Sequence, residues 1–145
     1  MRVVEASKEY LESVWKRVKD SKGIWASLDG NSEVKFYKAC LEANVLIDLD
    51  FGLAFASNLK PGHSCDVHGV FWSKEIVKDR EKIPFALNGL ATTFKLRRIE
   101  CVIPSELRTL SKLLVRWGFT IEGCMKSYYK TSDRFVDGLM YAIIY

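Results

Sequence analysis

The hydrophobic positions in the first third of the chain predict a short strand and two helices. Residues 1–6 are typical of a strand, and Ser7 is a suitable N-cap for a helix directly after it. That helix has one apolar stripe at helical spacing, formed by Tyr10, Leu11, Val14, Trp15 and Val18. A loop at 21–31 with two glycines precedes a second helix, for which Ser32 is the expected N-cap. Its apolar face consists of Phe36, Ala39 and Cys40.

From residue 44 the pattern changes to short apolar runs that predict three strands. Two runs cover 44–50 and 52–59, and a Pro-Gly turn at 60–64 leads to a third at 65–72. Because these runs are neighbours in sequence, we expect them to pair in antiparallel fashion.

The next segment predicts a crossover connection. Pro84 fits the N1 position of a helix over 84–96, and the β-branched run at 98–104 predicts another strand. A strand, a helix and a strand imply a right-handed connection. We therefore expect 65–72 and 98–104 to form a parallel pair.

The last quarter predicts a helix and a hairpin. Ser105 is the expected N-cap of the helix, and Gly118 stops it at C′. The helix has an apolar face formed by Leu107, Leu110, Leu113, Leu114 and Trp117. Strands at 119–130 and 135–145 are joined by the polar turn 131–134. The order β-α-α-β-β-β-α-β-α-β-β predicts one α/β domain spanning residues 1–145.

Composition agrees with a globular chain that acts in the cytoplasm. Of the 145 residues, 48% are hydrophobic and 28% charged, which is neither apolar-poor nor charge-rich enough for disorder. No apolar run reaches the roughly 18–20 residues that span a bilayer, and the N-terminus continues directly into charged residues. We expect no membrane association.

The charge distribution and the cysteines indicate no specific reactive site. The net charge of +4 is concentrated in basic segments at 15–22, 73–82 and 95–98, which would favour an anionic ligand or simply solvate the surface. Aromatic residues are not interleaved with these segments, which argues against nucleic-acid binding. The four cysteines lie far apart in apolar stretches, so we expect four buried, reduced thiols.

The segment 61–72, PGHSCDVHGVFW, gathers the chemically active side chains. It contains both histidines of the chain, His63 and His68. On a strand, however, Cys65 and His68 point to opposite faces, which argues against a metal site. His68 is then either a general base or a packed histidine that bonds the adjacent strand or Asp66.

The segment 103–123, IPSELRTLSKLLVRWGFTIEG, resembles the GNAT acyltransferase family, in which a strand runs into a helix that ends in Gly-Phe. The matching residues are Val102, Ile103, Pro104, Leu113, Gly118, Phe119, Glu122 and Gly123. The final hairpin, with Asp137 and Tyr141, is similar as well. The resemblance implies a mixed central sheet flanked by helices, and an acyl-CoA, such as acetyl-CoA, held between the strands at Val67–Trp72 and Glu100–Ile103.

The same resemblance implies roles for individual residues. An amine acceptor would attack the thioester while His68 or Glu100 takes the proton, and Tyr128 or Tyr129 would supply a proton to the leaving thiolate. The expected cofactor contacts are Phe71, Trp72, Lys78, Arg80, Lys82 and Ser105.

Three departures from the family pattern weaken the expectation of catalysis. The loop at 73–83 has no glycine that would let backbone amides close on a pyrophosphate, and Pro84 removes one donor. Leu107 stands where the family often has a cofactor-binding Asn, and Leu114 where it has a proton-donating Tyr. Loss of a general acid typically costs about 10²–10⁴-fold in rate.

Two functions therefore stay open at this point: an acyl-CoA-dependent N-acyltransferase and a non-catalytic GNAT-like binding or assembly protein. Segment 61–72 is similar to a phage-borne branch of the superfamily, which implies a protein partner in a viral assembly or in host machinery. The protein would then be located in the host cytoplasm or in the virion. Exposed sheet edges would also allow an oligomer.

Overall fold

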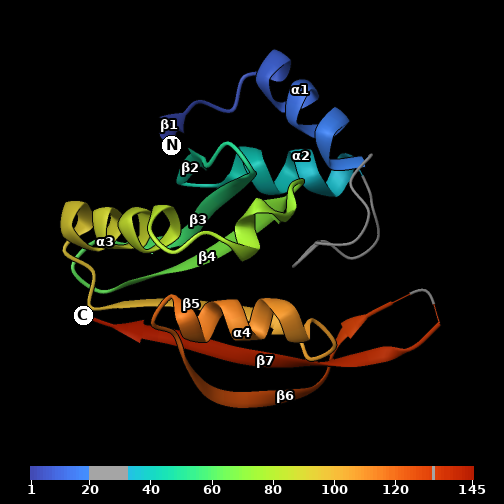
Figure 1. Cartoon of the computed structure of the whole chain (residues 1–145), viewed down its shortest axis with the longest axis vertical. Coiled ribbons are helices and arrows are strands. Elements are labelled where there is room, and N and C mark those ends of the chain that lie inside the picture. Colours follow the sequence, from blue (N-terminus) through green and yellow to red (C-terminus); the bar gives the residue numbers. More distant parts are fainter. Residues whose placement is uncertain (20–32, 132) are drawn as a thin grey trace.

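The computed structural model describes residues 1–19, 33–131 and 133–145 as a seven-stranded mixed sheet with four α-helices. The elements are β1 (Arg2–Val4), α1 (Lys8–Lys19), α2 (Glu33–Glu42), β2 (Val45–Asp48), β3 (Gly52–Lys60), β4 (Ser64–Phe71), the 3₁₀ helix η1 (Lys74–Val77), α3 (Lys82–Phe94), β5 (Arg98–Pro104), α4 (Arg108–Arg116), β6 (Thr120–Lys130) and β7 (Phe135–Ile144). Figure 1 shows their arrangement. The expected fold class and element order are confirmed.

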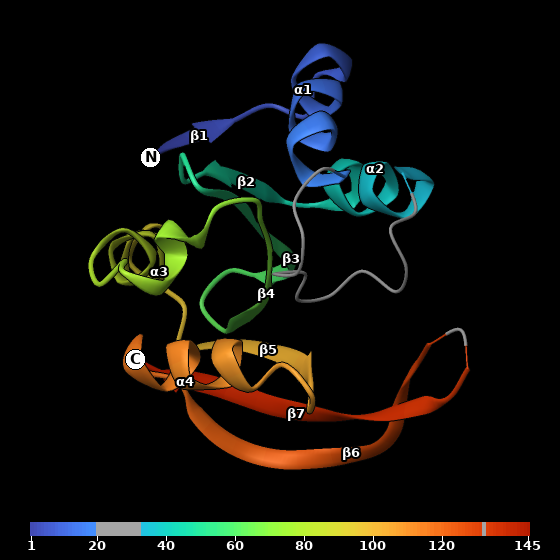
Figure 2. The same ribbon diagram turned by 45° about the vertical axis from the view of Figure 1, so that its right-hand side comes forward.

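The strands lie in the order β1-β2-β3-β4-β5-β7-β6. Strands β1 to β4 form consecutive antiparallel pairs, and β4 and β5 are parallel, as the sequence predicts. Strand β7 lies between β5 and β6 and pairs antiparallel with both. The hairpin of β6 and β7 extends past the start of α4 (Figure 2).

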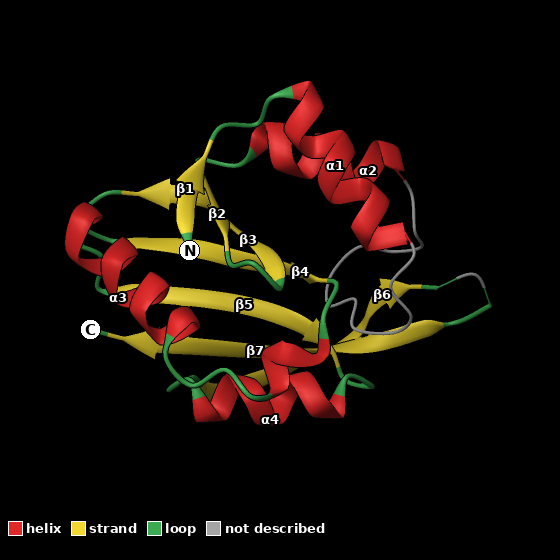
Figure 3. Ribbon diagram, turned by 45° about the horizontal axis from the view of Figure 1, so that its top comes forward, coloured by secondary structure: helices red, strands yellow, loops and turns green. Residues whose placement is uncertain are grey.

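Helices cover both faces of the sheet (Figure 3). Helices α3 and α4 pack on one face, and α1 and α2 pack on the other. On β4 the alternation is clear, because Cys65, Val67 and Phe71 join the α3/α4 side while Val70, and Trp72 directly after the strand, join the α1/α2 side. The residues of β4 therefore reach both helical layers.

The helix ends agree with the sequence at some points and correct it at others. The Ser7 hydroxyl accepts a hydrogen bond from the Tyr10 amide, and Gly118 has a φ of +97°, so both predicted signals are confirmed. Pro84 was expected at N1 but is the third residue of α3. Ser105 is not an N-cap, because α4 begins after Leu107 and its first turn has no side-chain cap. Ser32 lies outside the described residues.

The cysteines are all free thiols. Three are buried as expected, but Cys124 is exposed on β6, so its predicted burial is wrong. Its strand lies at the edge of the sheet, where an apolar sequence neighbourhood does not guarantee a covering layer. None of the described helices has the length and apolar character needed to cross a membrane.

Candidate active site between β4 and β5

The two parallel strands β4 and β5 separate soon after they pair. Their ladder joins Ser64–Asp66 to Arg98–Glu100 and no later residue of either strand, within the described chain. Figure 1 shows β4 turning away from β5 beyond this point. A parallel pair that opens in this way exposes unpaired backbone edges in the middle of a sheet, which is a favourable position for a ligand.

On the α3/α4 side, the opening leads to an apolar cavity of about 70 Å³. Its walls include Val67 and Phe71 of β4 and Ile103 of β5, and Leu114 of α4 closes one side. Leu114 thus lies in the wall of the cavity at the position where the family resemblance expects a tyrosine. This side of the opening suits an apolar chain and offers no proton donor from Leu114.

Phe71 has a buried position in this wall because two glycines make room for its ring. A Cβ built on Gly69 would lie 2.4 Å from Phe71 Cζ, and one on Gly52 would lie 2.3 Å from Phe71 Cδ1. Both distances are far below any real Cβ contact. The Gly-x-Phe sequence in β4 therefore fixes the ring over the strand and shapes the cavity.

On the opposite side, the opening leads to a polar recess of about 350 Å³. Asp66 of β4 and Glu100 of β5 contribute carboxylates, and Tyr128 and Tyr129 of β6 contribute aromatic rings. The Tyr129 hydroxyl donates a hydrogen bond of 2.7 Å to the carbonyl of Val102 on β5. Acidic and aromatic side chains together suit a cationic or amine group.

His68 lines both the cavity and the recess. Its ring stacks on Phe55 of β3, with 5.1 Å between the ring centroids, and its Nε2 lies 3.0 Å from the Ser57 hydroxyl. Burial lowers the pKa of the imidazole below the usual 6.5, and the neighbouring Asp66 carboxylate opposes this shift only partly. His68 is therefore a half-buried, neutral imidazole at neutral pH, situated where the two spaces meet.

The other two predicted catalytic residues also lie at the recess. Glu100 accepts a hydrogen bond of 2.6 Å from Arg98 Nε, and the same guanidinium pairs with Glu122 of β6. Tyr128 is 49% exposed and stands edge-on to Tyr129. The structure thus brings His68, Glu100 and Tyr128 to the rim of one recess.

The predicted cofactor contacts are more scattered. Phe71 lines the cavity, but Trp72 faces the α1/α2 side, where its indole Nε1 donates to the Asp50 carbonyl and Arg17 lies over its ring. Ser105 lies in the turn before α4, and its amide donates to the Asp137 carbonyl. Trp72 and Ser105 therefore lie away from the cavity walls.

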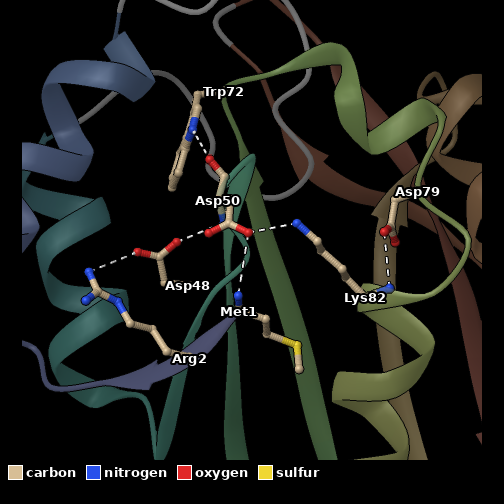
Figure 4. A network of polar contacts seen from close by, with 7 residues as sticks. All are labelled: Met1, Arg2, Asp48, Asp50, Trp72, Asp79 and Lys82. Atoms are coloured by element: carbon tan, nitrogen blue, oxygen red, sulfur yellow. Dashed lines mark hydrogen bonds and ion pairs between the residues drawn. The ribbon is translucent and has the colours of Figure 1, made fainter.

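The three basic residues expected to attract phosphate follow η1. Lys78 and Arg80 have exposed side chains. Lys82 is bound, because its Nζ lies 2.7 Å from Oδ2 of Asp50 (Figure 4). This hydrogen bond lowers the pKa of Asp50 and raises that of Lys82.

The N-terminus of α3 is closed by an acidic side chain of the same loop. The Asp79 carboxylate accepts hydrogen bonds from the amides of Lys82 and Ile83, each at 3.1 Å. Figure 4 shows Asp79 beside the start of the helix, while the Lys82 side chain extends away from it towards Asp50.

Comparison with solved structures identifies the architecture. A GNAT-family acetyltransferase from Bacillus anthracis matches with a TM-score of 0.70 and 18% identity, over 98% of this chain and 93% of that one. An acetyltransferase from Salmonella typhimurium that modifies the N-terminal serine of ribosomal protein L7/L12 matches with a TM-score of 0.77 and 17% identity, over 99% and 94% of the chains.

The chain has the GNAT fold. A third GNAT structure, a ribosomal L7/L12 alpha-N-protein acetyltransferase in complex with coenzyme A, matches with a TM-score of 0.72 and 15% identity over 98% and 92% of the chains. No family model matches the sequence, and neither does any curated protein.

The residues of this chain fit one part of an acyl-CoA and do not fit another. The apolar cavity and the unpaired edges of β4 and β5 suit the narrow acyl-pantetheine arm. The start of α3 does not suit a pyrophosphate, because the amides that would bind it already bind Asp79.

Several residues that shape the site were not predicted from the sequence. Asp79 could have been found, because Asp side chains just before a helix often accept hydrogen bonds from nearby backbone amides. The sequence around Ser57 did not indicate a role in the site, because its hydrogen bond with His68 depends on the register between β3 and β4. The hydrogen bond of 2.5 Å between Ser111 of α4 and Tyr141 of β7 could not be predicted either, because the two residues are 30 positions apart in the sequence.

Proposed function

We propose that this protein transfers an acyl group from a pantetheine thioester to an amine, using the opening between β4 and β5. The observation that carries the proposal is the position of His68. One side chain lines both the apolar cavity on the α3/α4 side and the polar recess on the α1/α2 side. A base at the junction of donor and acceptor spaces is what direct transfer requires.

In this proposal the chain provides positioning and proton transfer, while the thioester provides the activated carbonyl. The amine nitrogen attacks that carbonyl, the carbon–sulfur bond breaks, and the proton lost by the amine passes to the imidazole of His68. The low pKa of His68 keeps it neutral and able to accept that proton at pH 7. Glu100 is the second candidate base, and Tyr128 is the group at the recess that protonates the thiolate.

The acceptor enters through the polar recess. The carboxylates of Asp66 and Glu100 face this space, and a charged amine is attracted to them before it gives up a proton. Asp66 is held by Asn58, whose side-chain amide donates to it at 2.5 Å. A fixed carboxylate of this kind positions an amine without taking part in the transfer.

Binding and transfer are tested together. Acetyl-CoA and acetyl-pantetheine are each titrated by calorimetry, and acetylated product is then measured by mass spectrometry with a set of primary amines. A thioester at 100 times its dissociation constant should stabilise the fold by about 2.7 kcal/mol. Absence of any heat, thermal shift or product at millimolar thioester would overturn the proposal.

A second candidate is a non-catalytic binding or assembly protein built on the same scaffold. Two observations favour it: Leu114 in the cavity wall in place of a proton donor, and Asp79 on the amides of α3. The similarity of residues 61–72 to a phage-borne branch would assign such a role to a virion or a host-interaction protein. Failure of both thioesters in the titration above is the result that this candidate predicts.

A further inference from the structure

We propose that Asp79 takes the place of the donor's pyrophosphate at the start of α3, so that this protein recognises an acyl thioester through its pantetheine arm and gains no affinity from the nucleotide. The inference rests on the proposed function and deepens it, because it names the class of donor. A donor without a nucleotide would serve as well as an acyl-CoA.

The backbone donors at the start of α3 are already in use. The first four N–H groups of a helix have no partner within the helix and form the usual anion site. In α3 the amides of Lys82 and Ile83 donate to the two oxygens of Asp79, and the Phe85 amide donates to the carbonyl of Glu81. Pro84 has no N–H. The Phe85 bond is the first of the helix's own bonds, so the first three helical positions, residues 82–84, are all accounted for without a ligand.

The charge at the start of α3 also disfavours a diphosphate. The carboxylate of Asp79 already compensates the positive end of the helix dipole, and it would repel a diphosphate at the same place. The ammonium of Lys82, the basic side chain nearest to these amides along the chain, is bound to Asp50 at 2.7 Å. Lys78 and Arg80 still offer exposed cationic side chains, but these give a diffuse attraction without a backbone cradle.

The loop that carries Asp79 is held in place by contacts with α4. Arg116 of α4 donates to the Val77 carbonyl at 2.8 Å, and the indole of Trp117 donates to the Asp79 carbonyl at 3.4 Å. Ile76 is fully buried beneath the same loop. Withdrawal of Asp79 to admit a phosphate would therefore disturb contacts with α4 as well as the helix cap.

The test compares donors that differ only in the nucleotide. Dissociation constants of acetyl-CoA and acetyl-pantetheine are measured by calorimetry for the wild-type chain and for Asp79→Ala, which frees the amides of Lys82 and Ile83. In the wild type we expect the two constants to agree within about threefold. In Asp79→Ala, acetyl-CoA should bind at least about tenfold more tightly than acetyl-pantetheine. A tenfold difference corresponds to one charge-assisted hydrogen bond between a freed amide and the pyrophosphate.

A matched control is Glu81→Ala. It removes one carboxylate from the same exposed loop, and Glu81 makes no side-chain bond to the helix. Its ratio of dissociation constants should equal that of the wild type, which separates the release of amides from a simple change of charge. If loss of the cap unfolds Asp79→Ala, Asp79→Asn serves as a second variant, because it keeps a side-chain oxygen on the amides and removes only the negative charge. Acetyl-CoA should then gain affinity over acetyl-pantetheine, by less than in Asp79→Ala, because only the charge repulsion is relieved.

Failure of the inference is distinguishable from failure of the proposed function. Wild-type binding of acetyl-CoA more than about threefold tighter than that of acetyl-pantetheine would overturn the inference and leave thioester binding intact. An unchanged ratio in Asp79→Ala, with the variant folded, would also overturn it. Binding of neither thioester would overturn the proposed function, and the inference with it.

Discussion

The imidazole of His68 is joined to Ser57 across the β3–β4 ladder, with 3.0 Å between Nε2 and the serine hydroxyl oxygen. This contact fixes the ring at the point where the cavity and the recess meet. Strand β3 thus orients the proposed base, while β4 carries it. The sequence left two interpretations of His68 open: the bond to the adjacent strand is confirmed, and the role as general base stays a prediction.

A pH dependence of stability follows from the lowered pKa of His68. The unfolded chain takes up a proton near pH 6.5, whereas the folded imidazole takes it up only at lower pH, so the unfolded state binds more protons in that interval. Stability should be fully present above pH 6.5 and fall as the pH drops below it, by at most about 1.4 kcal/mol per pH unit. Urea unfolding between pH 7.5 and 5 measures this slope.

The control for this prediction is His68→Gln, which keeps a polar partner for Ser57 but does not titrate. Its free energy of unfolding should change less steeply than that of the wild type over the same pH interval. Equal slopes in the two proteins would show that His68 is not a neutral imidazole shifted by burial.

Gly69→Ala should destabilise the fold. The new methyl group would lie 2.4 Å from Phe71 Cζ, so the buried ring or the strand must move. Overpacking of this kind typically costs about 1–3 kcal/mol. Chemical denaturation measures the loss, and a shift of Phe71 should also weaken thioester binding because its ring lines the cavity.

Gly89 provides a matched comparison. A Cβ added there meets nothing within 4 Å, and the residue lies inside α3. Gly89→Ala should therefore stabilise the protein by about 0.5–1 kcal/mol. If Gly69→Ala proves as well tolerated as Gly89→Ala, the account of the β4 wall is wrong.

Lys82→Met should raise the pKa of the Asp50 carboxyl. In the wild type the hydrogen bond and charge of Lys82 are the main causes that hold this pKa below its ordinary value of 3.8. Titration of the side-chain carboxyl by ¹³C NMR measures the change. A pKa of Asp50 that is identical in both proteins would mean that Lys82 does not bind it in solution, and that Lys82 is available to an anionic ligand.

Tyr141→Phe tests the contact between α4 and β7. The tyrosine is buried, and its hydroxyl shares a short hydrogen bond with Ser111. Removing it leaves a half-buried serine hydroxyl without this partner, which should cost about 1–3 kcal/mol. The double variant with Ser111→Ala should cost little more than Tyr141→Phe alone; additive losses would indicate that the two residues do not interact.

The fold could be predicted largely from local patterns, because helical and strand periodicities and the Gly118 stop each act within a few residues. Local patterns also separated Cys65 from His68 onto opposite faces of β4. They could not show that β7 inserts between β5 and β6, since that choice is made by packing across the whole sheet.

The candidate site was less predictable for the same physical reason. The positions of His68 and Phe71 follow from strand alternation, but Ser57 and Tyr141 meet their partners only through tertiary register. Trp72 was expected beside the cofactor and lies instead on the opposite face, because it is the next residue after Phe71 on an alternating strand.

The most direct test of the central claim is the rate of acetyl transfer from acetyl-pantetheine to a primary amine, measured at pH 7.5 for the wild type and for His68→Gln. The account predicts acetylated amine and free thiol in equal amounts with the wild type, and a rate lower by about 10²–10⁴-fold in the variant, with thioester affinity preserved. Equal rates in the two proteins would contradict it.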